Sequence, residues 1–385
     1  MTEPAPTLAV IGGGQLARMM AQPAIALGLP LRLLAEGEGV SAAQVIPDHL
    51  VGDYRDLDTL VKVTDGCAVV TFDHEHVPTE HLHALEESGV AVRPGPEALV
   101  HAQDKGVMRS RLAELGVPCP RNAMVRSVAE IEAFGFPCVL KRARGGYDGK
   151  GVWVVRTAEE CEEPLWVATE SGVRLLVEEL VDFRRELAAL VVRAPSGQAA
   201  AYPVVESTQR DGICHEVVAP APGLDADLAS TAQELALRIA GALDVTGVLA
   251  VELFETADGR VLVNELAMRP HNTGHWTQDG AVTSQFENHL RAVMDLPLGS
   301  PAARARWTVM VNILGGPGDT GRLYDGYPHA LARDPFLRVH LYGKELRPGR
   351  KVGHVNAYGD DLDDCLERAR HAAAWFRGDL GDESE

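Results

Sequence analysis

A glycine-rich loop follows an apolar run in the segment KRARGGYDGKGVWVV, which spans residues 141–155. Its spacing differs from that of a Walker phosphate loop, because three residues rather than four separate Gly145 from Gly149. In addition, Gly151 stands after the lysine, where that loop has Ser or Thr. Glycines between Lys141 and Lys150 still suit a mobile flap that lays backbone amides and cations over phosphate groups.

The same loop carries two side chains with polar groups, the phenol of Tyr147 and the carboxylate of Asp148. A solvated surface loop would explain the glycines alone. A phenol and a carboxylate among them favour a loop that closes over a substrate and brings these groups to it.

A pair of carboxylates is expected in the segment VTGVLAVELFETADGRVLVNELAMRP. Two strand-like runs are joined there by Asp258-Gly259, which is typical of a two-residue hairpin turn. Glu252 and Glu265 lie equally far from this turn, so their Cβ atoms are expected about 4.5–5.5 Å apart across the ladder. Because their neighbours are apolar, the pair needs a cation or a proton, and oxygen ligands favour Mg²⁺. The alternative is an exposed pair on an edge strand, and a slipped register would remove the pairing.

The next segment, RPHNTGHWTQDG, has a polar loop composition. His271 and His275 have the spacing of two zinc ligands on a helix, but Pro270 and Gly274 disfavour a helix there. Arg269, His271 and Asn272 beside a metal fit an anion site better.

A second glycine motif, VIGGGQLAR, stands between a strand-like and a helix-like run. Gly12, Gly14 and Ala17, with Glu36 about 20 residues further on, match a dinucleotide-binding fingerprint. The same glycines also suit any tight turn that presents helix amides to an anion, or a purely structural turn. A dinucleotide-dependent oxidoreductase therefore remains an alternative at this point.

Alternating strands and helices between residues 7 and 93 indicate a parallel sheet with crossover helices. Short strands and helices over about 118–182 predict a smaller unit, which contains the glycine-rich loop. Longer strands then predict an antiparallel sheet. The predicted class is α/β and α+β, in three domains at 1–103, 104–298 and 299–385.

The chain of 385 residues has a net charge of -19, so its field repels nucleic acid and anionic membranes. It has no apolar run near the length of a membrane helix, about 20 residues, and no export-type start, so we expect a cytoplasmic protein. Four cations, Lys344, Arg347, Arg350 and Lys351, run against the acidic trend. They form either a solvated basic stretch or a local anion site.

Five motifs in this order resemble the N5-carboxyaminoimidazole ribonucleotide synthetase family of the ATP-grasp superfamily: GGGQLARM, KRARGGYDGKG, EELVDFRRELA, VNELAMRPHNTGHWTQDGA and KELRPGRKVGH. The resemblance covers nearly the whole chain. It implies an ATP-grasp fold with a Rossmann-like N-terminal domain, a small lid and a larger antiparallel domain. It also implies carboxylation of aminoimidazole ribonucleotide with bicarbonate and ATP through carboxyphosphate, with Mg²⁺, in a homodimer.

The resemblance assigns residues to four groups. The catalytic group is Asp148, Arg269, His271 and Asn272. The ATP-binding group is Lys105, Lys141, Gly146, Tyr147, Asp148, Gly149, Lys150, Gly151, Val152, Glu178, Glu179, Leu180, Val181, Glu186, Gln209, Asn264 and Glu265. The substrate group is Gly14, Gln15, Glu75, Tyr147, Asp148, Lys344, Arg350 and Lys351. The metal ligands are Glu252 and Glu265.

Two positions depart from the family pattern. Gln209 stands where relatives often have a histidine near the nucleotide, and Asp73 and His74 stand where a glutamate and an aromatic residue are common. Another ATP-grasp ligase with a different acceptor, and an inactive nucleotide-binding module, remain as further alternatives.

Overall fold

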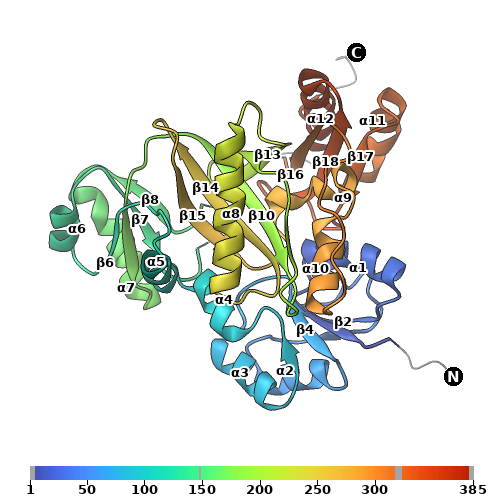
Figure 1. Cartoon of the computed structure of the whole chain (residues 1–385), viewed down its shortest axis with the longest axis horizontal. Helices are drawn as coiled ribbons and strands as arrows, with labels where there is room; N and C mark the ends of the chain where they lie inside the picture. Colours follow the sequence, from blue (N-terminus) through green and yellow to red (C-terminus); the bar gives the residue numbers. More distant parts are fainter. Residues whose placement is uncertain (1–4, 147–148, 317–322, 381–385) are drawn as a thin grey trace.

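The computed structural model describes residues 5–146, 149–316 and 323–380. Their strands form three sheets, and Figure 1 shows the lid sheet at one side of the long central sheet and the N-terminal domain below it. None of the helices in these ranges combines the length and apolar character needed to span a bilayer.

The N-terminal sheet is parallel in the order β3-β2-β1-β4-β5, as predicted. Its strands are β1 (Leu8–Ile11), β2 (Leu31–Ala35), β3 (His49–Val51), β4 (Val69–Phe72) and β5 (Ala91–Val92). The helices of this part are α1 (Gln15–Leu27), α2 (Leu57–Thr64), α3 (Thr79–Glu87) and α4 (Pro96–Gln103). Every residue of β1 and β4 is buried, because central parallel strands are covered on both faces.

Helix α5 (Lys105–Glu114) leads from this domain into the lid. Asp104 caps it by accepting the amides of Gly106 and Val107 at 2.9 and 3.1 Å. The lid sheet has the order β6-β9-β7-β8, with β6 (Asn122–Val125), β7 (Cys138–Arg142), β8 (Val152–Val155) and β9 (Leu175–Glu179). Helices α6 (Val128–Phe134) and α7 (Glu162–Ser171), with the 3-10 helix η1 (Glu159–Cys161), complete the lid.

The third sheet contains nine antiparallel strands in the order β15-β14-β10-β12-β13-β16-β18-β17, with β11 paired to β10. Its strands are β10 (Phe183–Arg193), β11 (Ala199–Ala201), β12 (Val205–Arg210), β13 (Ile213–Ala219), β14 (Gly247–Thr256), β15 (Val261–Ala267), β16 (Trp307–Leu314), β17 (Arg338–Leu341) and β18 (Lys351–Gly359). The predicted antiparallel sheet is confirmed, and the last three strands extend it. The domain limits at 103 and 298 stay a prediction.

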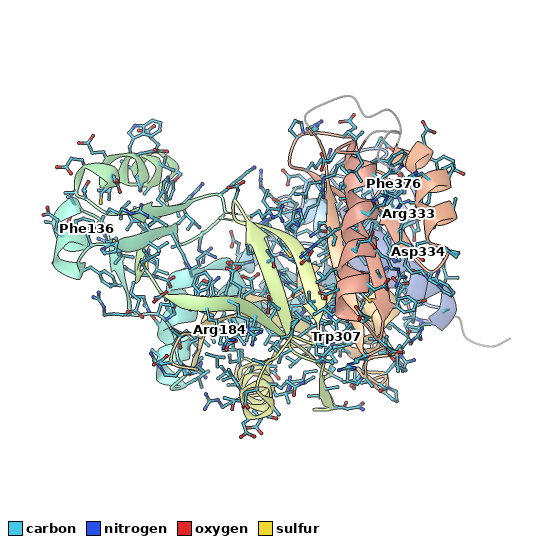
Figure 2. The ribbon with its side chains drawn as sticks, turned by 90° about the horizontal axis from the view of Figure 1, so that it is seen from above. Phe136, Arg184, Trp307, Arg333, Asp334 and Phe376 are labelled. Carbon is cyan, nitrogen blue, oxygen red and sulfur yellow. The ribbon has the colours of Figure 1, made fainter. Side chains whose placement is uncertain are left out.

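The remaining helices lie around this sheet. They are α8 (Ala226–Ala242), η2 (Asn272–Gly274), α9 (Thr277–Gly280), α10 (Gln285–Val293), η3 (Leu323–Gly326), α11 (Tyr327–Arg333) and α12 (Leu362–Arg377). Figure 1 shows α8 crossing one face of the long sheet, and Figure 2 shows Phe136 of the lid and Phe376 of α12 at opposite ends of the molecule. One apolar cluster joins Ile11 and Phe72 of the parallel sheet to Leu187 and Leu266 of the long sheet, so these two parts share a core.

Candidate active site

A cavity of about 900 Å³ lies where the three sheets meet. Gln15 and His74 come from the N-terminal domain, Lys141 from the lid, Glu265 from β15 and Lys351 from β18, and all of them line the cavity. The elements that the sequence predicted for separate domains therefore contribute side chains to the same space.

Glu252 on β14 is paired with Glu265 on β15, as the sequence predicts. The predicted two-residue turn is wrong, however, because the amide of Thr256 donates to the carbonyl of Arg260 at 2.9 Å and encloses a three-residue loop. This shift is reversed further along, where Leu253 pairs with Val263 and Asn264 is left as a β-bulge. The longer loop shifts the register by one residue and the bulge at Asn264 shifts it back, so the carboxylates still face each other.

Cations neutralise only one member of this pair. Burial acts to raise the pKa of Glu265, but the ammonium of Lys105, which contacts Glu265 Oε1, lowers it below its usual value. Burial first, and then the charges of Glu265 and Glu186, raises the pKa of Glu252 to about 7. Two carboxylates with an incomplete set of countercharges form an oxygen-rich site that fits a divalent cation such as Mg²⁺.

Lys141 contacts the bulge residue. Its Nζ atom is 2.6 Å from Glu178 Oε2 and donates to Asn264 Oδ1 at 2.9 Å. The side-chain amide nitrogen of Asn264 in turn lies 3.4 Å from Glu252 Oε2. Of the two lysines that the resemblance assigns to ATP phosphates, Lys105 therefore contacts Glu265 directly, and Lys141 is linked to Glu252 through Asn264.

The glycine-rich loop lies over this region. Gly146, Gly149 and Val152 line the cavity, and Gly149 and Gly151 have φ values of 74° and 76°. A Cβ atom on Gly149 would lie 3.0 Å from the carbonyl oxygen of Asp211, in the turn after β12. Lys150 is exposed in this loop. The predicted positions Tyr147 and Asp148 lie outside the described residues.

The segment assigned to adenine recognition follows β9. Glu178, Glu179, Leu180 and Val181 all line the cavity, and both oxygens of Glu178 are bound, one by Lys141 and one by Arg109 at 2.5 Å. Glu178 therefore contributes to the site by fixing Lys141.

Two further positions of the ATP-binding group lie on the long sheet. Glu186 and Gln209 also line the cavity. Burial raises the pKa of Glu186 to about 7, with a smaller opposing effect of Lys141. Gln209 Nε2 donates to Ser207 Oγ at 3.0 Å.

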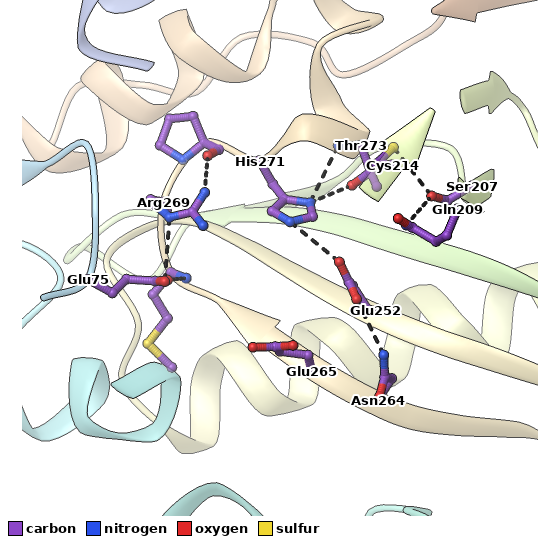
Figure 3. A network of polar contacts seen from close by, with 12 residues as sticks. Glu75, Ser207, Gln209, Cys214, Glu252, Asn264, Glu265, Arg269, His271 and Thr273 are labelled. Carbon is purple, nitrogen blue, oxygen red and sulfur yellow. Dashed lines mark hydrogen bonds and ion pairs between the residues drawn. The ribbon is translucent and has the colours of Figure 1, made fainter. Parts of the chain in front are cut away.

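The polar loop after β15 lies beside Glu252 (Figure 3). His271 Nε2 is 3.5 Å from Glu252 Oε1, and burial lowers the pKa of His271 well below its usual value. Arg269 Nε lies 3.4 Å from Glu75 Oε2. Among the described residues, the buried side-chain amide of Asn272 has no hydrogen-bond partner with good geometry, although it lies close to the thiol of Cys214. His275 also lines the cavity, but its Nδ1 is 3.0 Å from Gln285 Nε2, so the rings of the two histidines have different partners.

The basic segment and the GGGQLA turn meet beside the cavity. Lys351 and Gln15 line the cavity, whereas Lys344, which contacts Gln15 Oε1, and Arg350 are not among the described residues that line it. Arg350 lies in the turn at the start of β18, where its Nη1 is 3.4 Å from the carbonyl oxygen of Glu345. Glu75 Oε1 accepts the amide of Met268 at 2.5 Å, which ties the N-terminal domain to the loop carrying Arg269.

Carboxylates of the chain itself bind the amides of the GGGQLA turn. Glu36 Oε2 accepts the amide of Gly13 at 2.9 Å, and the Asp73 carboxylate accepts the amides of Gly14 and Ala17 at 3.0 and 2.7 Å. A dinucleotide pyrophosphate needs these amides and would meet two carboxylates. The geometry therefore disfavours the oxidoreductase alternative.

Known families match three segments of the chain. Residues 5–103 match the ribonucleotide synthetase preATP-grasp domain, residues 110–286 the ATP-grasp domain, and residues 308–368 the phosphoribosylaminoimidazole carboxylase C-terminal domain. The N5-carboxyaminoimidazole ribonucleotide synthase of Mycobacterium tuberculosis is 56% identical over 377 residues, which cover 97% of this chain and 88% of the relative. The chain belongs to this family of synthases.

Other members of the synthase family are also similar to this chain over nearly its whole length. The relative from Corynebacterium ammoniagenes is 52% identical, with 96% of this chain and 91% of the relative covered. The crystal structure of the Aspergillus clavatus synthase in complex with ADP and 5-aminoimidazole ribonucleotide has a TM-score of 0.88 at 31% identity, covering 97% of this chain and 99% of that chain. The synthetase from Thermus thermophilus has a TM-score of 0.85 at 38% identity, covering 98% of this chain and 100% of that chain.

The predicted family and fold are thus confirmed, and the chain is an ATP-grasp ligase of the N5-carboxyaminoimidazole ribonucleotide synthase family. The roles of individual site residues stay predictions. Two functional contacts were missed from the sequence, the Asp73 cap on α1 and the contacts of Arg109. The only signal for Arg109 is its position four residues after Lys105, which places both side chains on one face of α5.

Proposed function

We propose that this chain carboxylates the exocyclic amine of 5-aminoimidazole ribonucleotide with bicarbonate, converts ATP to ADP and phosphate, and acts in purine biosynthesis. The observation that carries the proposal is the set of groups that share one cavity. The carboxylate pair, Lys105, Lys141, the Arg269–Asn272 loop and Lys351 supply its lining, and Gln15 in its wall contacts Lys344. Nucleotide phosphates, bicarbonate and a ribonucleotide monophosphate all need cationic or amide groups of this kind.

The first step forms carboxyphosphate. A bicarbonate oxygen attacks the γ phosphorus, and the bond to the β-phosphate oxygen breaks to release ADP. Arg269 and Asn272 would orient bicarbonate, and the two lysines would stabilise charge on the transferring phosphoryl group. Glu252 and Glu265 would hold Mg²⁺, which when bound supplies Lewis-acid stabilisation of phosphate charge.

In the second step carboxyphosphate releases carbon dioxide beside the amine. The new bond forms between the amine nitrogen and this carbon, phosphate leaves, and the amine loses a proton. Burial lowers the pKa of His271 and keeps its ring neutral, so the ring can accept a hydrogen bond from a reactant beside Glu252. Asp148 would orient the amine or take its proton, and Tyr147 would contact the substrate.

The substrate phosphate would lie near Lys344, Arg350 and Lys351, with Gly14, Gln15 and Glu75 around the sugar. An acidic protein can bind a dianionic phosphate only through such a local basic cluster. Glycines at 146, 149 and 151 would let the loop cover the reactants and exclude water from carboxyphosphate.

The cellular context is part of the same proposal. We expect the chain to act in the cytoplasm, where the other substrates of nucleotide synthesis are present, and as a homodimer, as the family resemblance implies. Light scattering after size-exclusion chromatography gives the mass in solution, and a monomer at all concentrations would contradict the dimer.

The decisive assay measures ADP release with Mg²⁺ and bicarbonate, with and without 5-aminoimidazole ribonucleotide. ADP release that depends on the ribonucleotide, together with incorporation of labelled bicarbonate into an acid-labile product, is expected. ADP release that another amine acceptor stimulates more strongly would indicate a different ligase of the same fold.

A further inference from the structure

Arg109 on α5 is a buried cation that touches two of the three sheets. Its relative exposure is 3%, and it is not among the described residues that line the cavity. The guanidinium donates from Nε to Glu178 Oε1 at 2.5 Å, from Nη1 to the carbonyl of Val263 at 2.8 Å, and from Nη2 to the carbonyl of Asn264 at 2.7 Å. One planar group thus joins β9 of the lid to β15 of the long sheet.

The two carbonyls belong to the bulge that orients the carboxylate pair. Val263 pairs with Leu253 and Glu265 with Glu252, so Asn264 has no opposite residue on β14. A bulge leaves backbone groups outside the ladder, and buried carbonyls need a donor. Arg109 supplies this donor at the residue immediately before Glu265.

On the lid side, the same guanidinium fixes a lysine through a carboxylate. Glu178 Oε2 lies 2.6 Å from Lys141 Nζ, and Lys141 donates to Asn264 Oδ1 at 2.9 Å. The contacts form a closed ring from Arg109 through Glu178 and Lys141 to the side chain of Asn264, and back through the Asn264 carbonyl. A shift of Arg109 would therefore displace Lys141 and Glu265 together.

We propose that Arg109 is a positioning residue for the nucleotide-phosphate end of the site, which sets the spacing between Lys141 on the lid and Asn264 and Glu265 on the long sheet without touching the nucleotide. This inference rests on the proposed use of ATP. A lysine at this position keeps the charge but reaches one acceptor instead of three, because only the planar fork matches all of them.

The test compares Arg109→Lys and Arg109→Met with the wild-type chain. We expect the Kd for ATP in the presence of Mg²⁺, measured by calorimetry, to rise about 10- to 100-fold in Arg109→Met and less in Arg109→Lys, which is the range for residues that orient ligands indirectly. The Michaelis constant for 5-aminoimidazole ribonucleotide should stay within about twofold, because the contacts of Arg109 are to Glu178, Val263 and Asn264 and not to the residues assigned to the ribonucleotide.

Arg368→Lys is the matched control. Arg368 on α12 also has a mostly buried guanidinium, bound to Asp334 at 2.7 Å and Asp364 at 3.0 Å, and none of these three residues lines the cavity. The Arg368→Lys variant should have a lower melting temperature and an unchanged Kd for ATP. If Arg109→Lys and Arg109→Met changed only the melting temperature, as the control does, the positioning role would be wrong.

Glu178→Gln weakens the link between Arg109 and Lys141 without changing Arg109 itself. This variant is the alternative test if the Arg109 variants do not fold. It should raise the Kd for ATP in the same way, and an unchanged Kd in a folded Glu178→Gln would overturn the proposal. Nucleotide binding is measured without the acceptor. A wild-type chain that binds ATP but fails to carboxylate the ribonucleotide would therefore contradict the proposed function and leave the test of Arg109 valid.

Discussion

Asp73 Oδ2 lies directly over Gly14, so that a Cβ atom on Gly14 would be 2.1 Å from this oxygen. The approach is close because the carboxylate accepts the amides of Gly14 and Ala17 and thereby caps α1. Gly14→Ala would have to displace either the helix start or β4. The neighbouring Gln15 contacts Lys344, so a displacement here would reach the residues proposed to bind the substrate.

Asp73→Ala removes both hydrogen bonds to the start of α1. We expect a loss of about 1–3 kcal/mol in the free energy of unfolding, measured by urea denaturation, because buried amides are left without an acceptor. We also expect a higher Michaelis constant for the ribonucleotide and an unchanged one for ATP. An increase for ATP alone would contradict the assignment of this turn to the substrate end.

Glu265→Gln removes one charge from the carboxylate pair. The fold should survive, because repulsion with Glu252 is relieved, whereas turnover of ATP should fall by more than about 100-fold if the site holds Mg²⁺. Titration of activity with Mg²⁺ checks this prediction. Near-normal turnover at limiting Mg²⁺ would rule out the metal role of Glu265.

Gly149→Ala tests the loop over the phosphates. The substitution strains a residue with φ of 74° and brings Cβ to 3.0 Å from Asp211 O, so the Michaelis constant for ATP should rise several-fold with little change in melting temperature. Gly172→Ala is the control, because Gly172 also has a positive φ, 64°, but open space around its Cβ. Equal kinetic effects of both variants would contradict the role of the loop.

Lys344→Ala tests the basic cluster. Loss of a charged hydrogen bond of about 1.5–3 kcal/mol should raise the Michaelis constant for the ribonucleotide by about 10-fold or more and leave that for ATP unchanged. Arg347→Ala is the control, because the Arg347 side chain is 68% exposed and pairs with Glu345. If both constants rose together in Lys344→Ala, the cluster would not be the phosphate site.

His289 makes stability depend on pH. Burial lowers its pKa to about 3, and the neutral ring bonds Thr71 Oγ1 at 2.8 Å and the amide of Val248 at 3.2 Å. The unfolded chain takes up this proton below about pH 6.5, so stability is complete above that pH and falls towards pH 3 by about 1.4 kcal/mol per unit. In urea denaturation, His289→Gln should reduce this slope by the contribution of about one proton. An unchanged slope in His289→Gln would contradict the prediction.

Much of the site was predictable from local patterns. The strand and helix alternation, the facing glutamates and the basic stretch all depend on neighbours in sequence, and the motif order identified the family. The turn after β14 shows the limit, because the pairing of Glu252 with Glu265 was right although both the loop length and the bulge at Asn264 were missed. A dipeptide sets a preferred turn, but packing of the strand ends decides which turn forms.

Contacts between distant segments were not predictable in this way. Asp73 lies 59 residues from Gly14, and Arg109 lies 154 residues from Val263. Neither pairing leaves a periodic signal in the chain. The sequence suggested a ligand at the GGGQLA amides, whereas the chain's own carboxylates bind them.

The continuity of the long sheet sets what can move during turnover. From β15, with Glu265, to β18, with Lys351, every strand is hydrogen-bonded to the next, and the lid has a sheet of its own. Hydrogen bonds link all the strands along this direction, so under the proposed function the sheet would act as a spacer between the groups assigned to the nucleotide and those assigned to the substrate phosphate. Selectivity for the size of the acceptor would then be set by the sheet, and loop closure would control timing and water exclusion.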